Sequence, residues 1–268
     1  VSIKYDGSTT AKTNAGSYAV TATVTDSNYT GSASATLVID RAALTIAGLT
    51  GGPYTYNGLP HGVTASTTPS GKSLSYTYNG SASTPINAGT CSVLVTSNDA
   101  NFVGSLTGTL VINKASVTYS LSNLSQSYTG GELRPTITSS PSSIASSVTF
   151  NGDGAVPTYV GSYSVQVASA DPNYVEVSNS NTFEITQASQ TITFDALTAM
   201  TDASPDQVLA ADATSALSVS FTSLTTSTCT IVAGRLHPLT TGLCTVAANQ
   251  SGDANFHAAA QVTRSITI

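Results

Sequence analysis

The sequence has no tryptophan, a single methionine and few charged residues. Asp, Glu, Lys and Arg make up only 8% of its 268 residues, against about 25% in an ordinary soluble protein. The net charge is −6 and the basic residues are scattered, so the chain lacks the basic patch that nucleic-acid binding requires. Hydrophobic residues still account for 40% of the chain, which is too many for an intrinsically disordered protein.

Long apolar runs are also absent. No run approaches the roughly 20 apolar residues of a membrane-spanning helix, so we expect no membrane insertion within this segment. An initiator methionine and a signal peptide are missing as well. We therefore expect the chain to be a segment of a longer protein, with any signal or anchor outside it.

Motifs of enzyme chemistry do not occur. The sequence contains no Gly-x-Ser-x-Gly, P-loop or His-Glu-x-x-His motif. The histidines His61, His237 and His257 fall in different turns or loops, and none has a nearby Cys or carboxylate in a recognisable catalytic arrangement. We expect no enzyme and no cofactor, apart from the calcium alternative discussed below.

The sequence does contain two short motifs that each occur four times. Gly-x-(Tyr/Cys)-x-Val occurs at 16–20, 89–93, 161–165 and 242–246. Asp-x-Asn-(Tyr/Phe) follows it at 26–29, 99–102, 171–174 and 253–256. The glycines of the first motif are 73, 72 and 81 residues apart. Such a period is typical of tandem modules.

The predicted modules span residues 1–42, 43–115, 116–188 and 189–268. Short joints at Arg41, Lys114 and Gln187, 73 residues apart both times, separate the four modules. The first module lacks the front half of the others, about 30 residues of the repeat. Either the end is cut, or another chain supplies a strand that completes the half-module.

Each module reads as short strands. In the stretch 18–24, apolar residues alternate with small polar ones, which predicts a strand with one buried face. Asp-Gly or Asn-Gly follows an aromatic residue at 5–7, 56–58, 78–80 and 150–152, which predicts hairpin or bulge turns. We predict an all-β protein: an elongated tandem array of small antiparallel, immunoglobulin-like β-sandwiches, or alternatively of rolled-sheet modules.

The Asp-x-Asn motif has two interpretations. In the structural one, the Asp and Asn side chains bond to the backbone of their own turn and the aromatic residue packs on the sheet. In the alternative, the four aspartates of the motif help to bind calcium at module junctions, although each site would need several more oxygens. These residues are Asp26, Asp99, Asp171 and Asp253.

Three segments, 54–66, 86–93 and 98–115, with their counterparts in the other copies, resemble the mostly-beta glycine-rich (MBG) repeats of bacterial surface proteins. The fourth module resembles bacterial immunoglobulin-like repeats, through "QTITF" at 190–194 and the ending at 252–268. Together the two resemblances cover nearly the whole chain. They imply extracellular display, on a cell surface or after secretion, in the stalk of an adhesin.

The second resemblance also implies a disulfide. Repeats of this type carry two cysteines, here Cys229 and Cys244, and both have the phase of core-facing residues. A disulfide between them would fit an oxidising compartment, whereas a zinc site would need a second pair of ligands. Cys91 stands where other copies have tyrosine, and we expect a buried free thiol, with an intermolecular bridge as the alternative.

The predicted function is that of a structural spacer, which extends a distal binding domain from the cell. Its expected partners are other repeats of the same parent chain. The rival is a module that binds a host or environmental glycan or protein through exposed aromatic residues in loops. The candidate contacts of that rival are Tyr54, Tyr56, Tyr128 and Tyr159.

Overall fold

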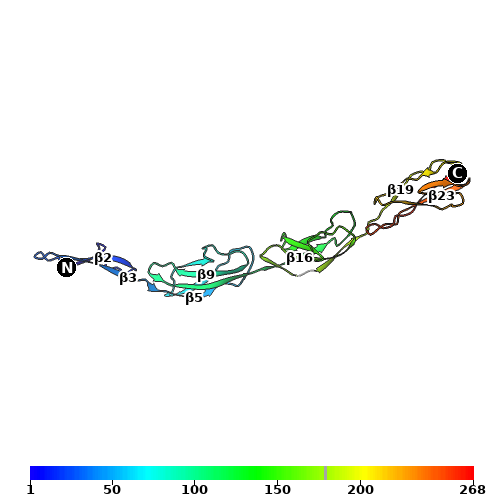
Figure 1. Cartoon of the computed structure of the whole chain (residues 1–268). Helices are drawn as coiled ribbons and strands as arrows, with labels where there is room; N and C mark the ends of the chain where they lie inside the picture. Colours follow the sequence, from blue (N-terminus) through cyan, green and yellow to red (C-terminus); the bar gives the residue numbers. More distant parts are fainter. Residues whose placement is uncertain (178–179) are drawn as a thin grey trace. The chain divides into compact units, whose positions relative to one another are not determined.

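The computed structural model describes residues 1–177 and 180–268, and strands, turns and loops account for all of them (Figure 1). Because these residues include no helix, none of them forms a helix long and apolar enough to cross a membrane. The chain divides into two compact units. Unit 1 comprises Val1–Val117 and Asp171–Glu176, and unit 2 comprises Thr118–Ala170 and Val177–Ile268. The prediction of an all-β fold with several small sheets is confirmed.

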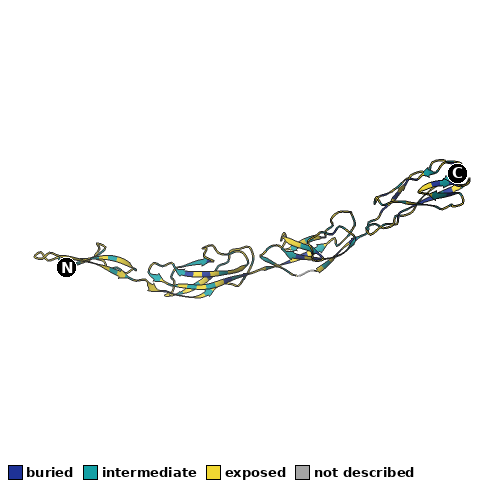
Figure 2. Cartoon of the chain, in the orientation of Figure 1, coloured by how far each residue is buried: buried dark blue, intermediate teal, exposed yellow. Residues whose placement is uncertain are grey.

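Unit 1 begins with a single antiparallel sheet. Its strands, in spatial order, are β1 (Ser2–Tyr5), β2 (Gly16–Thr23) and β3 (Ser32–Ile39). Strand β2 and the end of β3 alternate half-buried and exposed positions as their period-two sequences predict, but no residue of 1–43 is fully buried (Figure 2). This sheet therefore has no closed core of its own.

The second repeat, also in unit 1, forms a sandwich. One sheet has the order β6 (Tyr54–Thr55), β11 (Ser105–Asn113), β9 (Gly89–Ser97) and β8 (Leu74–Tyr78). The other layer consists of the pairs β5 (Thr45–Thr50) with β7 (Thr64–Thr68), and β4 (Ala42–Ala43) with β10 (Phe102–Val103). Side chains from both layers form one core: Leu44, Ile46, Val63, Tyr78, Val93, Val95 and Leu110.

The third repeat has the same strand order. Its four-stranded sheet is β13 (Ser125–Ser127), β18 (Ser180–Thr186), β16 (Gly161–Ser169) and β15 (Ser146–Phe150). The other sheet is β14 (Thr136–Ser140), β12 (Ala115–Ser122) and β17 (Tyr174–Glu176). The buried residues of this repeat are Val117, Tyr119, Phe150, Val165, Val167, Phe183 and Ile185. The four-stranded sheets of the second and third repeats have the same strand order. The repeat in sequence is therefore also a repeat in structure.

The fourth repeat, in unit 2, has a different arrangement of strands. The pair β19 (Ile192–Phe194) and β21 (Ala211–Ala213) accompanies two three-stranded sheets. These are β20 (Gln207–Val208), β24 (Arg235–Pro238), β23 (Cys229–Val232), and β22 (Ser220–Ser223), β25 (Leu243–Asn249), β26 (Val262–Thr267). The predicted disulfide between Cys229 and Cys244 is confirmed, and both residues are fully buried in the core of this repeat. Cys91 is half-buried and free.

Side chains of Asp and Asn hold the tight hairpins in the first three repeats. In each hairpin the first turn residue has a positive φ, 45° at Asp6, 47° at Asn79 and 51° at Asn151, and glycine follows. The side-chain Oδ1 of that residue accepts a hydrogen bond from an amide of the partner strand. The donors are Ala19, Ser92 and Ser164, each at 2.8 Å. The predicted hairpin turns are therefore confirmed at these three sites.

Asn151→Asp and Asn151→Ala should differ in stability. Aspartate at Asp6 already makes the same hydrogen bond with the same positive φ, so Asn151→Asp should keep the free energy of unfolding within about 0.5 kcal/mol. Asn151→Ala loses the acceptor and puts alanine, which tolerates the left-handed region less well than asparagine, at a positive φ; together these should cost about 2 kcal/mol. Urea unfolding of the three proteins measures both values, and equal losses for the two variants would contradict this account.

Removal of the disulfide should destabilise the fourth repeat alone. The cysteines are 15 residues apart in sequence, and opening a loop of that length should cost about 3 kcal/mol. Calorimetry of the Cys229→Ala/Cys244→Ala double variant should show one transition moved to lower temperature. Cys91→Ala is the control for loss of a thiol, and it should leave that transition in place. A double variant with an unchanged transition would contradict the prediction.

Candidate functional site

The four Asp-x-Asn turns share one local hydrogen bond. We use this name for Asp26–Tyr29, Asp99–Phe102, Asp171–Tyr174 and Asp253–Phe256. In every copy the Asp Oδ1 accepts from the backbone N–H of the Asn two residues later. The distances are 2.9, 2.9, 2.9 and 2.8 Å in chain order. The predicted bond of the Asp side chain to its own turn is thus confirmed, and it orients the Asn that follows.

The Asn side chain of the last three turns bonds to the preceding repeat. Its Oδ1 accepts a hydrogen bond from a backbone N–H that lies 85 to 95 residues earlier in the chain. The pairs are Ala15 to Asn101 at 2.7 Å and Ala88 to Asn173 at 2.8 Å, both in unit 1, and Val160 to Asn255 at 3.3 Å in unit 2. We call these three N–H groups the receiving amides. Each belongs to the residue directly before the Gly of Gly-x-(Tyr/Cys)-x-Val.

The backbone of the same Asn bonds to the joint between the repeats. Its carbonyl oxygen accepts from the N–H of the alanine that follows Arg41, Lys114 or Gln187. These bonds join Ala42 to Asn101 at 2.8 Å, Ala115 to Asn173 at 3.0 Å, and Ala188 to Asn255 at 2.9 Å. One asparagine therefore links the joint, through its backbone, to the preceding repeat, through its side chain.

The aromatic residue of the turn makes a further contact. Tyr174 meets the ring of Tyr56 in unit 1 with centroids 5.5 Å apart, and Phe256 meets Tyr128 in unit 2 at 5.4 Å. Both pairs are edge-to-face, which is a favoured geometry for aromatic rings. Tyr56 and Tyr128 occupy the same position in their repeats, 72 residues apart. The two contacts are therefore copies of one another.

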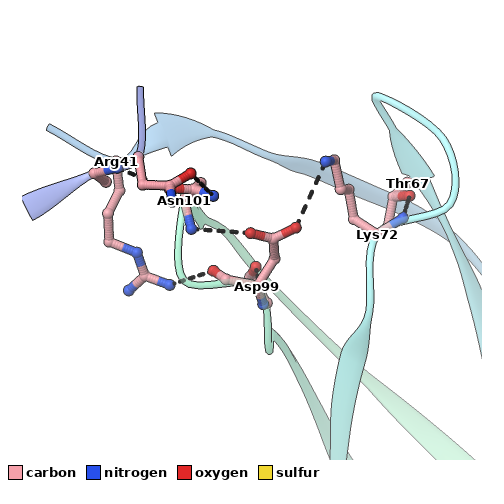
Figure 3. Close-up of polar contacts among 8 residues, drawn as sticks. Arg41, Thr67, Lys72, Asp99 and Asn101 are labelled. Carbon is pink, nitrogen blue, oxygen red and sulfur yellow. Dashed lines mark hydrogen bonds and ion pairs between the residues drawn. The ribbon is translucent and has the colours of Figure 1, made fainter. Parts of the chain in front are cut away.

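Two basic side chains from outside the second turn contact its Asp99 (Figure 3). The Arg41 guanidinium donates to the Asp99 carbonyl at 2.9 Å, and the Lys72 ammonium lies 3.5 Å from the Asp99 carboxylate. Lys72 also lies 4.2 Å from the ring centroid of Phe102, within cation–π range. Asn101 donates through its Nδ2 to the side chain of Asn14 at 3.2 Å. Side chains of the chain itself thus supply the positive charge beside this carboxylate.

The fourth turn is supported by two buried glutamines. Gln190 and Gln250 are 6% and 8% exposed. The Gln190 amide donates to the Gln250 side chain and to the carbonyl of His257, and the Gln250 oxygen also accepts from the N–H of Gly252. Both ends of the turn are thereby held. Sequence reasoning missed this pair because the two glutamines are 60 residues apart.

The tyrosines proposed as ligand contacts have diverse surroundings. Tyr54 is half-buried, donates its hydroxyl to the Gly62 carbonyl at 3.1 Å and stacks on His61 at 4.4 Å. Tyr56 and Tyr128 are half-buried in the aromatic pairs described above. Tyr159 is 65% exposed. Two of the four tyrosines, Tyr54 and Tyr56, lie in unit 1, and the other two lie in unit 2. Ligand binding by these tyrosines stays a prediction.

Groups with potential catalytic or metal chemistry are few. The part of the chain that the structure describes has no group of three or more His, Cys, Asp or Glu side chains that could hold a metal ion.

Sequence reasoning missed one pair of polar side chains: His237 Nδ1 lies 2.7 Å from Asp206 Oδ1, and the two side chains are 44% and 35% exposed. Two open hollows of about 320 and 440 Å³ lie beside Tyr119 and Gly51. Calcium binding at the four aspartates stays an untested alternative.

Comparison with known proteins identifies the family. The model of the MBG domain matches residues 1–43, 42–116 and 117–189. The chain belongs to the MBG domain family. No curated protein matches this MBG chain.

Several solved structures are similar to the MBG chain at low sequence identity. The surface layer protein SbsC, domains 1–6, is 12% identical over 95% of this chain and 45% of its own, with a TM-score of 0.27. Immunoglobulin domains 1–5 of Sidekick-1 are 12% identical over 97% and 67%, with a TM-score of 0.31. Drosophila N-cadherin EC1-3 is 9% identical over 66% and 76%, at 0.24. The chain spans less than half of the SbsC structure.

Asn101→Ala should release the receiving amide of Ala15. That amide loses its acceptor, so its hydrogen exchange should become about tenfold faster, as expected for a hydrogen bond worth roughly 1.4 kcal/mol. NMR-detected exchange on the full chain measures the rate, and the amide of Val95 in the core reports whether the repeat stays folded. Asn28→Ala is the matched control, because the first turn has the same sequence pattern but within residues 1–177 and 180–268 the Asn28 side chain makes no hydrogen bond to a receiving amide. An unchanged rate at Ala15 would refute the role of Asn101.

Proposed function

We propose that the chain is a spacer segment of a secreted or surface-attached bacterial protein, and that it holds a distal binding domain away from the cell. The observation that carries the proposal is the hydrogen bond from each receiving amide to the Asn of the following turn. A spacer needs repeats that resist bending at their joints. Membership of the MBG domain family and a buried disulfide support extracellular display.

Short joints add to the stiffness that a spacer requires. Strand β3 ends at Ile39 and β4 begins at Ala42, while β11 ends at Asn113 and β12 begins at Ala115. Linkers of one or two residues have little conformational freedom. Because the Asp-x-Asn turn also bonds across each joint, bending requires the loss of hydrogen bonds and not only rotation about a few backbone dihedrals.

The composition of the joints favours a spacer that works without a metal. At the second turn, Arg41 and Lys72 provide positive charge beside Asp99, the place where a calcium ion would otherwise act. At the fourth turn, the neutral amide of Gln187 donates to the Asp253 carbonyl at 2.7 Å. We propose a structural role with neither enzyme activity nor a cofactor, and a fourth repeat of the bacterial immunoglobulin-like type.

A second candidate function rests on one exposed aromatic ring. Tyr159 is 65% exposed and lies next to the receiving residue Val160. An exposed tyrosine is suited to stacking on a sugar ring or to a protein contact. In this alternative the chain binds a host or environmental glycan or protein directly. Among residues 1–177 and 180–268, no hydrogen-bond partner is found for the Tyr159 hydroxyl, which is why we favour the spacer.

Deletion of one repeat tests the spacer role. A reporter domain displayed on a cell at the end of the full chain is compared with one on a variant that lacks residues 116–188. In the variant Ala115 precedes Ser189, so the natural Ala-Ser joint is preserved. The reporter should lie nearer to the membrane by about 30 Å, the length of a nine-residue strand. Axial fluorescence localisation measures the height.

Two results, one from that comparison and one from a glycan array, would count against the spacer. An unchanged height would mean that the repeat contributes no length. Saturable, sugar-specific binding of the full chain on a glycan array, abolished by Tyr159→Ala, would favour the rival function. Tyr163→Phe serves as the matched control, because it removes a hydroxyl that bonds to the Tyr159 carbonyl but leaves the exposed ring.

A further inference from the structure

The fourth repeat has the same local geometry at its Gly-x-Cys-x-Val motif as the repeats that carry receiving amides. In the first three repeats the motif glycine pairs with the isoleucine of the closing strand: Gly16 with Ile39, Gly89 with Ile112, and Gly161 with Ile185. In the fourth repeat Gly242 exchanges two backbone hydrogen bonds with Ile268, at 3.1 and 2.9 Å. The residue before Gly242 is Thr241, which therefore occupies the position of Ala15, Ala88 and Val160.

The N–H of Thr241 differs from the receiving amides in one respect. Those three amides each donate to an Asn side chain. Within residues 1–177 and 180–268, no hydrogen bond is found for the N–H of Thr241, and the residue is exposed. Exposed apolar side chains flank it, since Leu239 is 48% and Leu243 is 58% exposed. At the position of Leu243 the other repeats have small polar residues, Ser17, Thr90 and Ser162.

We propose that this face of the fourth repeat, Leu239 to Leu243, is a vacant docking site for an Asp-x-Asn turn of a repeat joined to it in tandem. The inference rests on the proposed spacer function and names the partner that the site takes. The Asn Oδ1 of that turn would accept from the Thr241 N–H. Its aromatic residue would cover Leu239 and Leu243.

The fourth repeat also shows that the turn can come from a repeat outside the three matched by the MBG model. Its own turn, Asp253–Phe256, bonds to Val160 of an MBG repeat with the same three elements as the Asp171–Tyr174 turn. These are the Asp Oδ1 bond, the Asn Oδ1 bond and the aromatic pair. A site that requires only one N–H and an apolar surface can accept such a turn from either type.

A tandem partner fits this site better than a free second copy. One hydrogen bond and one aromatic contact cover far less area than the roughly 1,200 Å² of a stable interface between separate chains. When the two repeats are covalently joined, the effective concentration is in the millimolar range and a weak contact forms. The same reasoning applies to the three occupied joints.

The test duplicates the fourth repeat in register. Residues 186–268 are appended directly after Ile268, so that the added Thr186 follows the isoleucine that matches Ile185. The probe is therefore the second Asp253–Phe256 turn on the same polypeptide. In NMR-detected exchange, the Thr241 amide of the first copy should slow by about fivefold to tenfold relative to the 268-residue chain, the range of an ordinary hydrogen bond. Asn255→Ala in the appended copy should reverse this change.

Two internal controls separate failure of this inference from failure of the proposed function. The amide of Val246, in the core of each copy, reports that both copies fold. Val160, whose acceptor is the original Asn255, reports whether docking operates at all. If Val160 depends on Asn255 but Thr241 stays unprotected in the duplicated chain, the vacant site is refuted and the spacer stands. If Thr241 protection in the 268-residue chain rises with protein concentration, the occupant is a second copy, and the tandem proposal is overturned.

Discussion

A hydrogen bond from a backbone amide of one repeat to the Asn side chain of the following Asp-x-Asn turn recurs three times, each time inside one of the two compact units. Ala15, Ala88 and Val160 donate it in the three joints. Each repeat has only a small core, and the first sheet has no fully buried residue. A small core stabilises its repeat only marginally. Polar groups at fixed positions therefore provide the specificity of each joint.

The turn that supplies this Asn is held by hydrogen bonds other than the one to the receiving amide. The Asp Oδ1 bond fixes the turn, and the backbone carbonyl of the Asn is held by the joint alanine. Pre-organisation of this kind lowers the entropy lost when the side-chain bond forms. The supports around the turn differ between copies, with Arg41 and Lys72 at one and Gln190 and Gln250 at another. The residues that support the turn can therefore differ between joints, while the Asn hydrogen bond to the receiving amide stays the same.

Local features could be predicted from the sequence, and distant ones could not. The strands follow from period two, and the hairpins at Asp6, Asn79 and Asn151 follow from Asx-Gly pairs, because both depend on adjacent residues. The disulfide was predicted from the resemblance of the fourth module to bacterial immunoglobulin-like repeats. The partners of Asn101 and Asn255 lie 86 and 95 residues away, so no local pattern reveals them. One signal was present in the sequence. Both motifs recur in every repeat, and the receiving amide always belongs to the residue directly before Gly-x-(Tyr/Cys)-x-Val.

Residual dipolar couplings of unit 1 test the central claim most directly. Amides of β2 and β3 report the first sheet, and amides of β9 and β11 report the second repeat. If the Asn101 bond holds the two together, both sets should fit one alignment tensor of a single magnitude, and Asn101→Ala should separate them. Two different tensors in the unsubstituted chain would show that the repeats reorient independently and would contradict the account.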